Sequence, residues 1–198
     1  MRVIAGRAGG VRLAVPHRGV RPTMDRVKAA IFSSLGDAII GAHVLDLFAG
    51  SGALGIEALS RGAGSVLFVE EDRQSIDVIE KNLAKTRIEA RVRQQSVFDF
   101  LRHPSEIEKF DIIFADPPYE KTNSGERFTE KLLTSEELPQ LIEPPGIFVL
   151  EKHPVEALPE TGLWKLIRRK RYGATEVLFL SAMSASPART NPQSEIAQ

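Results

Sequence analysis

Apolar runs and amphipathic stretches alternate through the middle of this 198-residue chain. Short, mainly apolar runs, typical of strands buried on both faces, occupy residues 43–48, 65–70, 110–115 and 146–151, and residues 90–95 are expected to form a further strand. Helical patterns separate them at 53–61, 73–85 and 98–108, and after a polar loop at 120–126 a further helical stretch runs to about 142. Strands that alternate with helices predict parallel βαβ units, with helices on both faces of one sheet.

The two ends of the chain follow other patterns. Residues 2–5 and 11–15 alternate around a Gly-containing turn, which predicts a small β-hairpin. Residues 164–171 and 174–181 flank Tyr172-Gly173 and predict an antiparallel hairpin at the sheet edge. We therefore expect an α/β fold with a mostly parallel, seven-stranded sheet. Residues 184–198 are rich in Ser, Pro and polar side chains and predict a disordered tail.

A helix is also expected between the first hairpin and the first apolar run. Thr23 is a suitable N-cap, Gly36 follows the last periodic position, and Val27, Ile31 and Leu35 fall on one face. Arg26 and Lys28 lie off that face, so we expect them to be exposed and free to meet a charged partner.

Composition narrows the function classes. The absence of cysteine excludes disulfide scaffolds and thiolate chemistry, and the four histidines lack metal-ligand spacing, so we expect no metal. No secretory leader or membrane-length apolar run is evident, which favours a soluble cytoplasmic protein. The net charge is zero, yet residues 1–30 carry seven basic side chains against one acidic one, and a second basic cluster lies at 165–171. Such patches can bind phosphates on a neutral protein.

A glycine-rich turn follows the first strand. Gly50, Gly52 and Gly55 let the backbone turn tightly before a helix, and Glu70 at the end of the next strand can accept hydrogen bonds from ribose hydroxyls. The spacing satisfies the dinucleotide fingerprint, so NAD and S-adenosylmethionine are both candidates. Asp46 favours S-adenosylmethionine, because hydride transfer has no evident need for it.

The sequence Asp116-Pro117-Pro118-Tyr119 directly follows the fourth apolar run. Asp116 offers carboxylate acceptors, and the two prolines lack N–H donors, which leaves nearby carbonyls without their usual local partners. Tyr119 supplies a flat face on which a planar ring can stack. This combination could grip an amine on a flat heterocycle and predicts chemistry on a nucleobase nitrogen.

Longer motifs carry a family resemblance. The residues are Leu13-x-Val15-Pro16, Arg21-Pro22-Thr23-x-Asp25-Arg26-Val27-Lys28 with Phe32, and the run from Leu45 through Gly55 to Ala63. Together with Asp116–Tyr119 they are very similar to the RsmD family, bacterial 16S ribosomal RNA guanine-N2 methyltransferases of class I. The resemblance spans about Arg2 to Leu180.

The resemblance implies a Rossmann-like class I methyltransferase fold with three parts. Residues 1–36 would form an RNA-facing extension, 37–182 the methyltransferase domain, and 183–198 the tail. S-adenosylmethionine would donate a methyl group to the N2 amine of one guanine in 16S ribosomal RNA (position 966, by the same resemblance). The partner would be that RNA within a small-subunit assembly intermediate, and the protein would act as a monomer.

The resemblance also assigns the site residues. The catalytic set would be Asp116, Pro117, Pro118 and Tyr119. Cofactor contacts would come from Asp46, Phe48, Ala49, Gly50, Ser51, Gly52, Glu70, Ser96 and Val97. RNA contacts would come from Arg21, Thr23, Arg26 and Lys28. The chain departs from the family at Ser96, where an acid near the adenine is common; Asp99 lies three residues on.

Three alternatives stay open at this stage. An adenine-N6 methyltransferase would use the same Asp-Pro-Pro-Tyr motif, but this short chain has no evident target-recognition domain. An NAD-dependent oxidoreductase fits the glycines alone. A non-catalytic RNA-binding module fits the basic clusters and leaves the motif at Asp116 unexplained.

Overall fold

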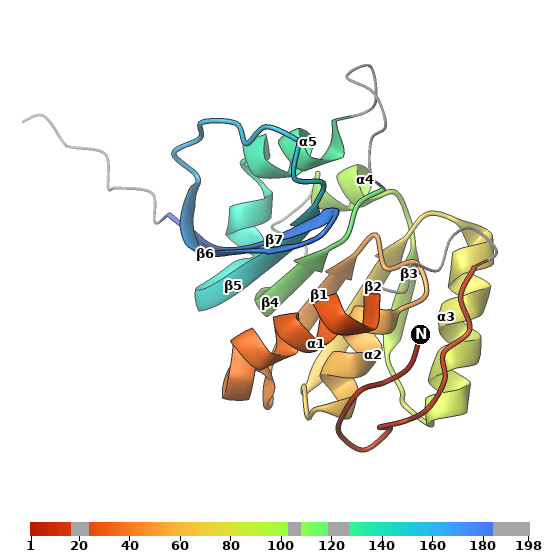
Figure 1. Cartoon of the computed structure of the whole chain (residues 1–198). Coiled ribbons are helices and arrows are strands. Elements are labelled where there is room, and N and C mark those ends of the chain that lie inside the picture. Colours follow the sequence, from red (N-terminus) through yellow and green to blue (C-terminus); the bar gives the residue numbers. More distant parts are fainter. Residues whose placement is uncertain (17–23, 103–107, 119–126, 184–198) are drawn as a thin grey trace, which may run out of the picture.

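A computed structural model describes residues 1–16, 24–102, 108–118 and 127–183. Its centre is a seven-stranded sheet in the order β3-β2-β1-β4-β5-β7-β6 (Figure 1). The strands are β1 (His43–Leu47), β2 (Ser65–Glu70), β3 (Arg91–Gln94), β4 (Phe110–Ala115), β5 (Ile142–Lys152), β6 (Trp164–Tyr172) and β7 (Thr175–Ala182). The first five run parallel, and β7 lies antiparallel between β5 and β6. The expected α/β fold of Rossmann-like type, with its antiparallel edge hairpin, is confirmed.

Helices cover both faces of the sheet. They are α1 (Met24–Leu35), η1 (Gly36–Ile39), α2 (Ala53–Ser60), α3 (Arg73–Thr86), α4 (Val97–Leu101), α5 (Phe128–Thr134) and η3 (Leu138–Leu141). One buried cluster joins α1, α2 and α3 to the sheet, and a second joins α4, α5 and η3 to its other side. We call these the α1 face and the α5 face.

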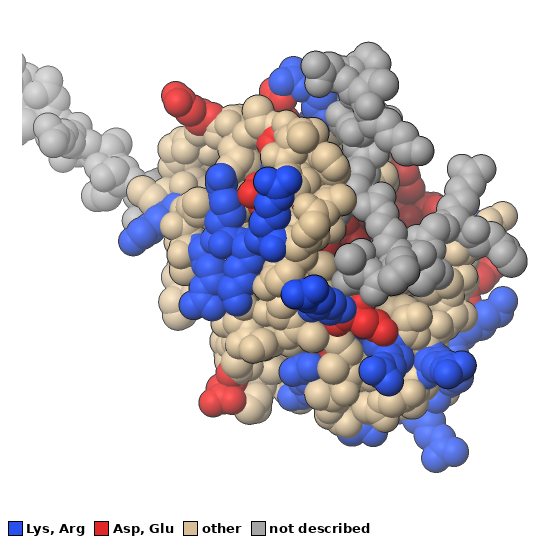
Figure 2. All heavy atoms as spheres, viewed as in Figure 1, with Lys and Arg blue, Asp and Glu red and all other residues tan. Residues whose placement is uncertain are grey.

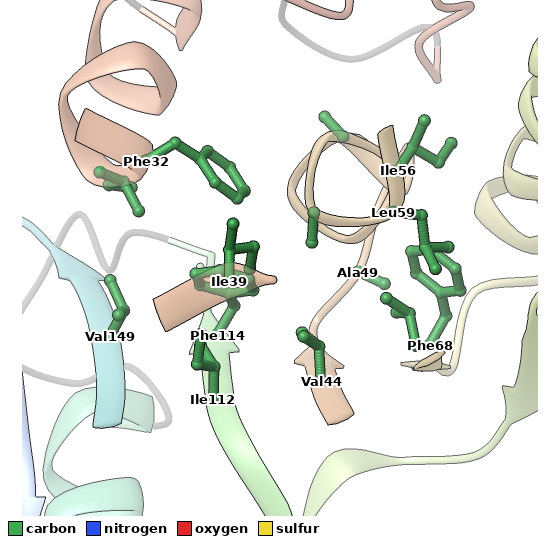
Figure 3. Close-up of a cluster of buried hydrophobic side chains, with 14 of the residues drawn as sticks. Phe32, Ile39, Val44, Ala49, Ile56, Leu59, Phe68, Ile112, Phe114 and Val149 are labelled. Atoms are coloured by element: carbon green, nitrogen blue, oxygen red, sulfur yellow. The ribbon is translucent and has the colours of Figure 1, made fainter. Parts of the chain in front are cut away.

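Alternating side chains divide the strands between the two faces. Val44 of β1, Phe68 of β2 and Phe114 of β4 lie in the α1-face cluster, where Phe32 of α1 packs with its ring centroid 5.6 Å from that of Phe114 (Figure 3). Their strand neighbours, such as Leu45, lie in the α5-face cluster. Because successive strand residues point to opposite faces, these assignments fix the direction of the residues that end each strand.

The N-terminal segment forms a turn against α2 with a single bridge. Arg2 pairs with Arg12 in an isolated antiparallel bridge, and the Val3 N–H donates to the Val11 carbonyl over 2.9 Å. The predicted hairpin is therefore present with only one bridge between its arms. Val3 and Leu13 are buried in the α1-face cluster, so this segment shares the core of the sheet.

Glu57 of α2 holds this segment in place. Its carboxylate is fully buried and accepts hydrogen bonds from the N–H groups of Ile4 (2.7 Å) and Ala5 (3.0 Å). It also forms ion pairs with Lys28 (3.2 Å) and Arg61 (2.7 Å). A single carboxylate thus joins the N-terminal turn, α1 and α2.

Three expectations about element boundaries are wrong. The helical stretch expected to reach residue 142 ends at Thr134 in α5, and only the short η3 follows. Strand β5 begins at Ile142, earlier than the expected residue 146, because Ile142 pairs with Phe110 at the start of β4. Pairing with a neighbouring strand outweighs the local pattern there. Helix α4 ends at Leu101, short of the expected end at 108.

Candidate active site

Four carboxylates come together where the central parallel strands end. Asp46 lies near the end of β1, Glu70 ends β2, Asp116 follows β4, and Glu151 lies near the end of β5. Each acid lies two residues after a residue of the α1-face cluster; these residues are Val44, Phe68, Phe114 and Val149, in the same order. Because strand side chains alternate, all four acids point to the α1 face. Ligands of open α/β sheets bind outside the carboxyl ends of the strands. This edge is therefore the candidate active site.

Burial and like charge act on two of these acids. Burial, followed by the charges of Asp116 and Glu70, raises the pKa of Asp46 from 3.8 to about 8, although the Gly55 N–H opposes the shift. Burial, followed by the charges of Asp116 and Asp46, raises the pKa of Glu151 well above its usual range. A cationic ligand placed among these groups would favour their ionised forms.

Sequence reasoning missed Glu151. The signal was available, because an acid at the end of β5 is analogous to Glu70 at the end of β2. Glu151 can be assigned to the site only when the strand order is known, because β5 then lies beside β4 and Glu151 lies next to Asp116.

The raised pKa of Asp46 predicts a pH dependence of stability. The folded chain keeps its proton up to pH about 8, whereas the unfolded chain loses it near 3.8, so stability decreases as pH rises between these values. The slope contributed is at most about 1.4 kcal/mol per pH unit. Urea unfolding from pH 5 to 9 should show a smaller decrease for Asp46→Asn than for wild type. If the unfolding free energies of Asp46→Asn and wild type changed equally with pH, the burial of an ionisable Asp46 would be contradicted. The control is Asp77→Asn, which replaces an acid at the surface of α3.

The turn after β1 uses left-handed backbone at Phe48 (φ 55°), Gly50 (φ 54°) and Gly52 (φ 73°). Left-handed backbone suits glycine, and it brings the chain around tightly before α2 begins at Ala53. The Gly50 N–H donates to Glu70 over 2.8 Å, and the Ala49 N–H donates to the Val69 carbonyl over 3.2 Å. The turn is therefore fastened to the end of β2.

Asp46 and Glu70 both brace backbone. Asp46 accepts the Gly55 N–H over 2.9 Å in the first turn of α2, and Glu70 accepts the Asp72 N–H over 2.9 Å as well as that of Gly50. A carboxyl group keeps further acceptor positions in either protonation state, so these contacts leave acceptor capacity for a ligand. Asp46 therefore braces the backbone without excluding ligand binding.

Gly55 is fixed by close packing of α2 on β2. A Cβ added there would lie 2.3 Å from the Phe68 ring and 2.8 Å from Val66. Alanine normally stabilises a helix over glycine, yet here the overlap dominates. Gly55→Ala should therefore destabilise the protein by about 1–3 kcal/mol in urea unfolding. The control is Ser33→Ala, at an exposed position of α1. Gly62→Ala would not serve as a control, because the φ of 105° at Gly62 itself disfavours a side chain. A Gly55→Ala variant as stable as wild type would contradict this packing.

Asn82 of α3 links the turn to the N-terminal segment and was also missed. It is fully buried, and its amide donates to the Ser51 and Ala14 carbonyls over 2.9 Å each while accepting the Ala14 N–H over 2.8 Å. Ser51 itself is buried. The N-terminal segment at Ala14 is thereby tied to the glycine turn after β1.

Ser96 and Val97 follow β3 at the same edge of the sheet. Ser96 is the N-cap residue of α4, and its carbonyl accepts the Phe100 N–H over 3.0 Å. Val97 is buried in the α5-face cluster. Asp99, the possible substitute for an acid at this place, forms an ion pair of 3.0 Å with Arg102.

An aromatic cluster flanks this place. The Phe48 ring lies edge-on to Phe98 (6.1 Å) and Phe128 (5.5 Å), and the Phe98 and Phe128 rings are stacked 6.0 Å apart. Lys131 of α5 lies 5.3 Å above the Phe98 ring. The three rings come from segments far apart in sequence, so the chain pattern did not indicate this cluster.

The proposed catalytic segment lies across from the turn. Asp116 is half-buried, Pro117 is buried and Pro118 is exposed, so the chain surfaces here from the core. Tyr119 lies outside the described residues. The charge of Asp116 acts on both Asp46 and Glu151, so Asp116 belongs to the same group of acids beside the glycine turn after β1.

The residues expected to contact RNA divide into three cases. Arg26 is exposed on α1. Arg21 and Thr23 lie outside the described residues. The expectation that Lys28 is exposed is wrong: it is buried, pairs with Glu57 and donates to the Arg2 carbonyl over 2.6 Å. Burial lowers the pKa of Lys28, and the nearby Glu57 charge opposes that shift. Its ammonium serves the fold rather than RNA.

Other site types have no support in the described residues. No group of three or more His, Cys, Asp or Glu side chains there could hold a metal ion. Among the helices described, none has the length and apolar content needed to span a membrane.

The chain is similar to known proteins over most of its length. The family described as conserved hypothetical protein 95 matches residues 1–181. Bacillus subtilis YlbH is 40% identical over 182 residues, which cover 89% of this chain and 96% of that protein. The Haemophilus influenzae ribosomal RNA small subunit methyltransferase D is 37% identical over 177 residues, covering 87% and 89%. A solved Thermus protein, hypothetical protein TTHA0928, superposes with a TM-score of 0.76 at 31% identity, covering 92% of this chain and 99% of its own.

Proposed function

The chain belongs to the RsmD family, and from that membership we propose that it methylates the exocyclic N2 amine of a guanine in 16S ribosomal RNA, with S-adenosylmethionine as methyl donor. One observation carries the proposal: Asp116, which opens the Asp-Pro-Pro-Tyr sequence, lies in the same group of carboxylates as Asp46 and Glu70 beside the glycine turn. A methyl donor and a methyl acceptor would therefore meet at one edge of the sheet.

The residues present suit the cofactor. Its sulfonium and ammonium groups are cations, and the site offers several carboxylates, two of which have pKa values raised by burial and like charge. Glu70 would bind the ribose hydroxyls, and the turn from Phe48 to Gly52 would lie against the rest of the molecule together with Asp46. Ser96 and Val97 would line the adenine side. When bound, S-adenosylmethionine supplies a methyl group activated by the positive charge on sulfur.

Asp116 and the Pro117 carbonyl would hold the target amine. Both accept hydrogen bonds, so together they can orient the two N–H groups of the amine and draw its lone pair out of conjugation with the ring. The Asp116 carboxylate also stabilises the positive charge that develops on nitrogen. Tyr119 would stack on the base, which must leave its own stack to reach the site.

Glu151 would support Asp116. Burial and the charges of Asp116 and Asp46 raise the pKa of Glu151, which favours its neutral form and so lowers the negative charge beside Asp116. That favours Asp116 as the anion that accepts from the amine. We therefore assign Glu151 a positioning role through its neighbour.

The remaining assignments follow the family. Residues 1–36 would form the RNA-facing extension, with Arg21, Thr23 and Arg26 toward the RNA, residues 37–182 the methyltransferase domain, and residues 183–198 a disordered tail. The substrate would be 16S ribosomal RNA within an assembly intermediate of the small subunit. The protein would act as a monomer in the cytoplasm, without a metal.

Nucleoside mass spectrometry of ribosomal RNA from cells lacking the protein tests the proposal. We expect N2-methylguanosine to be lost from one 16S position, mapped by primer extension, and restored by the purified protein with S-adenosylmethionine. Undiminished N2-methylguanosine would refute the proposal, and loss of N6-methyladenosine would identify an adenine methyltransferase. Calorimetry that shows binding of NAD instead of S-adenosylmethionine would identify an oxidoreductase.

A further inference from the structure

Strand β6 carries a row of basic side chains that the proposed site does not use. Residues 164–172 include five basic residues and no acid. Lys165, Arg168, Arg169 and Arg171 are exposed, and Lys170 is partly exposed. Figure 2, drawn in the orientation of Figure 1, shows Lys and Arg side chains gathered over the region of β6 and β7.

The pairing of β6 with β7 divides these side chains between the two faces. Arg168 pairs with Phe179 and Lys170 with Val177, and both partners lie in the α1-face cluster. Lys165 pairs with Ser181, which has the same alternation. Opposite residues in an antiparallel pair point to the same side, so Lys165, Arg168 and Lys170 lie on the α1 face. We call these three the β6 basic row.

One end of the β6 basic row, at Lys170, lies level with the candidate active site. Glu151 pairs with Val177 of β7, which pairs with Lys170. Ala115 of β4 pairs with Leu150 of β5, so the next residues of the two parallel strands, Asp116 and Glu151, are level with each other. Three strand spacings separate Asp116 from Lys170, about 14 Å along the sheet. Lys170 therefore shares one face and one height with the residues that would hold the target base, and Arg168 and Lys165 continue the row on that face along β6, away from this edge of the sheet.

The charge of the row is not neutralised by the described residues. Glu176 of β7 pairs with the buried Lys152 at 3.3 Å and lies 3.9 Å from Arg169 of the other face, so neither of these partners belongs to the row. Lys170 donates to the Ser34 hydroxyl of α1 over 2.9 Å, which anchors the end of the row without adding negative charge. Within the described ranges, Lys165 and Arg168 have no acidic partner.

Protection of the sheet edge does not account for the row. An edge strand needs charges or a bulge to prevent pairing with another chain, and either sign of charge serves. Strand β6 already has a register shift between Leu166 and Arg168. Five charges of a single sign exceed that need, and like charges this close destabilise the strand slightly unless a polyanion neutralises them.

We propose that the β6 basic row binds backbone phosphates of the substrate RNA beside the target nucleotide, as a docking surface separate from the N-terminal segment. This inference rests on the proposed function for the identity of the nucleic acid. RNA carries one phosphate per nucleotide, so a strand whose base enters the site at Asp116 has phosphates within reach of the row. Such contacts fix position and orientation but carry no sequence information.

Lys165→Gln/Arg168→Gln tests the proposal against Lys81→Gln/Lys85→Gln, which removes two exposed lysines from α3 beside β3 at the opposite sheet edge. Fluorescence anisotropy with an unmodified 16S ribosomal RNA transcript, without cofactor, gives affinity against salt concentration. We expect the β6 variant to bind about tenfold or more weakly, with a salt slope smaller by about 1.4–1.8, and the α3 variant to bind like wild type.

Each other outcome overturns the proposal. Unchanged RNA binding by the β6 variant would leave the row to an acidic protein partner, and equal losses in both variants would mean only a general effect of charge. Because binding is measured without methyl transfer, the result is separable from the proposed function. A wild-type protein that binds RNA through the row yet methylates no RNA would refute the proposed function alone. Circular dichroism and S-adenosylmethionine affinity should match wild type in both variants.

Discussion

Replacing Asp116 by alanine is expected to lower the rate constant for methyl transfer by about a hundredfold or more. The substitution removes a hydrogen-bond acceptor for the target amine and the nearest negative charge for the developing cation. The cofactor would be held by the turn after β1 and by Glu70, which fasten to one another without Asp116. Affinity for S-adenosylmethionine should therefore be nearly unchanged. Single-turnover kinetics with 16S ribosomal RNA and calorimetry with the cofactor measure the two effects separately.

Two further variants sharpen this experiment. Asp116→Asn keeps one acceptor oxygen but loses the charge, so its rate should lie between those of wild type and Asp116→Ala. Asp99→Ala removes an acid whose carboxylate pairs with Arg102 in α4, and it should not alter the rate. Equal loss of transfer and of cofactor affinity in Asp116→Ala would contradict the catalytic role and indicate that this residue shapes the site.

Replacing Glu57 by alanine should reduce the free energy of unfolding by about 3–5 kcal/mol. The substitution leaves the buried Lys28 ammonium without its partner and deprives the Ile4 and Ala5 N–H groups of their acceptor. An uncompensated buried charge and unsatisfied buried donors are each costly. Urea unfolding followed by circular dichroism measures the change.

Asp77→Ala is the control for Glu57→Ala, because its ion pair with Arg73 is exposed and should contribute less than about 1 kcal/mol. The double variant Glu57→Ala/Lys28→Met should recover part of the lost stability, since it removes the unpaired charge. A loss below about 1 kcal/mol for Glu57→Ala would show that the N-terminal segment is held by its apolar contacts alone.

Most of the fold could be predicted because its signals are local. The apolar runs and the glycine turn after β1 depend on neighbouring residues. Glu70 is the last residue of its strand, and Asp116 directly follows β4. Each signal needs only the alternation of strand side chains and the conformational freedom of glycine.

The burial of Lys28 was not predicted from the sequence pattern. The expectation set Lys28 apart from the apolar face of α1, yet it lies three residues before Ile31 and four before Phe32, which places it on that face. The N-terminal turn packs there, and Glu57, distant in sequence, supplies the opposite charge. The pattern of one helix does not reveal which distant residue will pair with a buried charge.

By itself, the sequence determined the parallel α/β sheet, the place of the glycine turn after β1 and the acids at the ends of β2 and β4. Only the tertiary structure decided that Glu151 joins Asp116, that Glu57 and Lys28 form a buried pair, and that β6 presents its basic row on the same face as the site. The reason is physical: these relations depend on strand order and on long-range packing, which bring distant residues together, whereas a pattern along the chain records only what each residue's neighbours require.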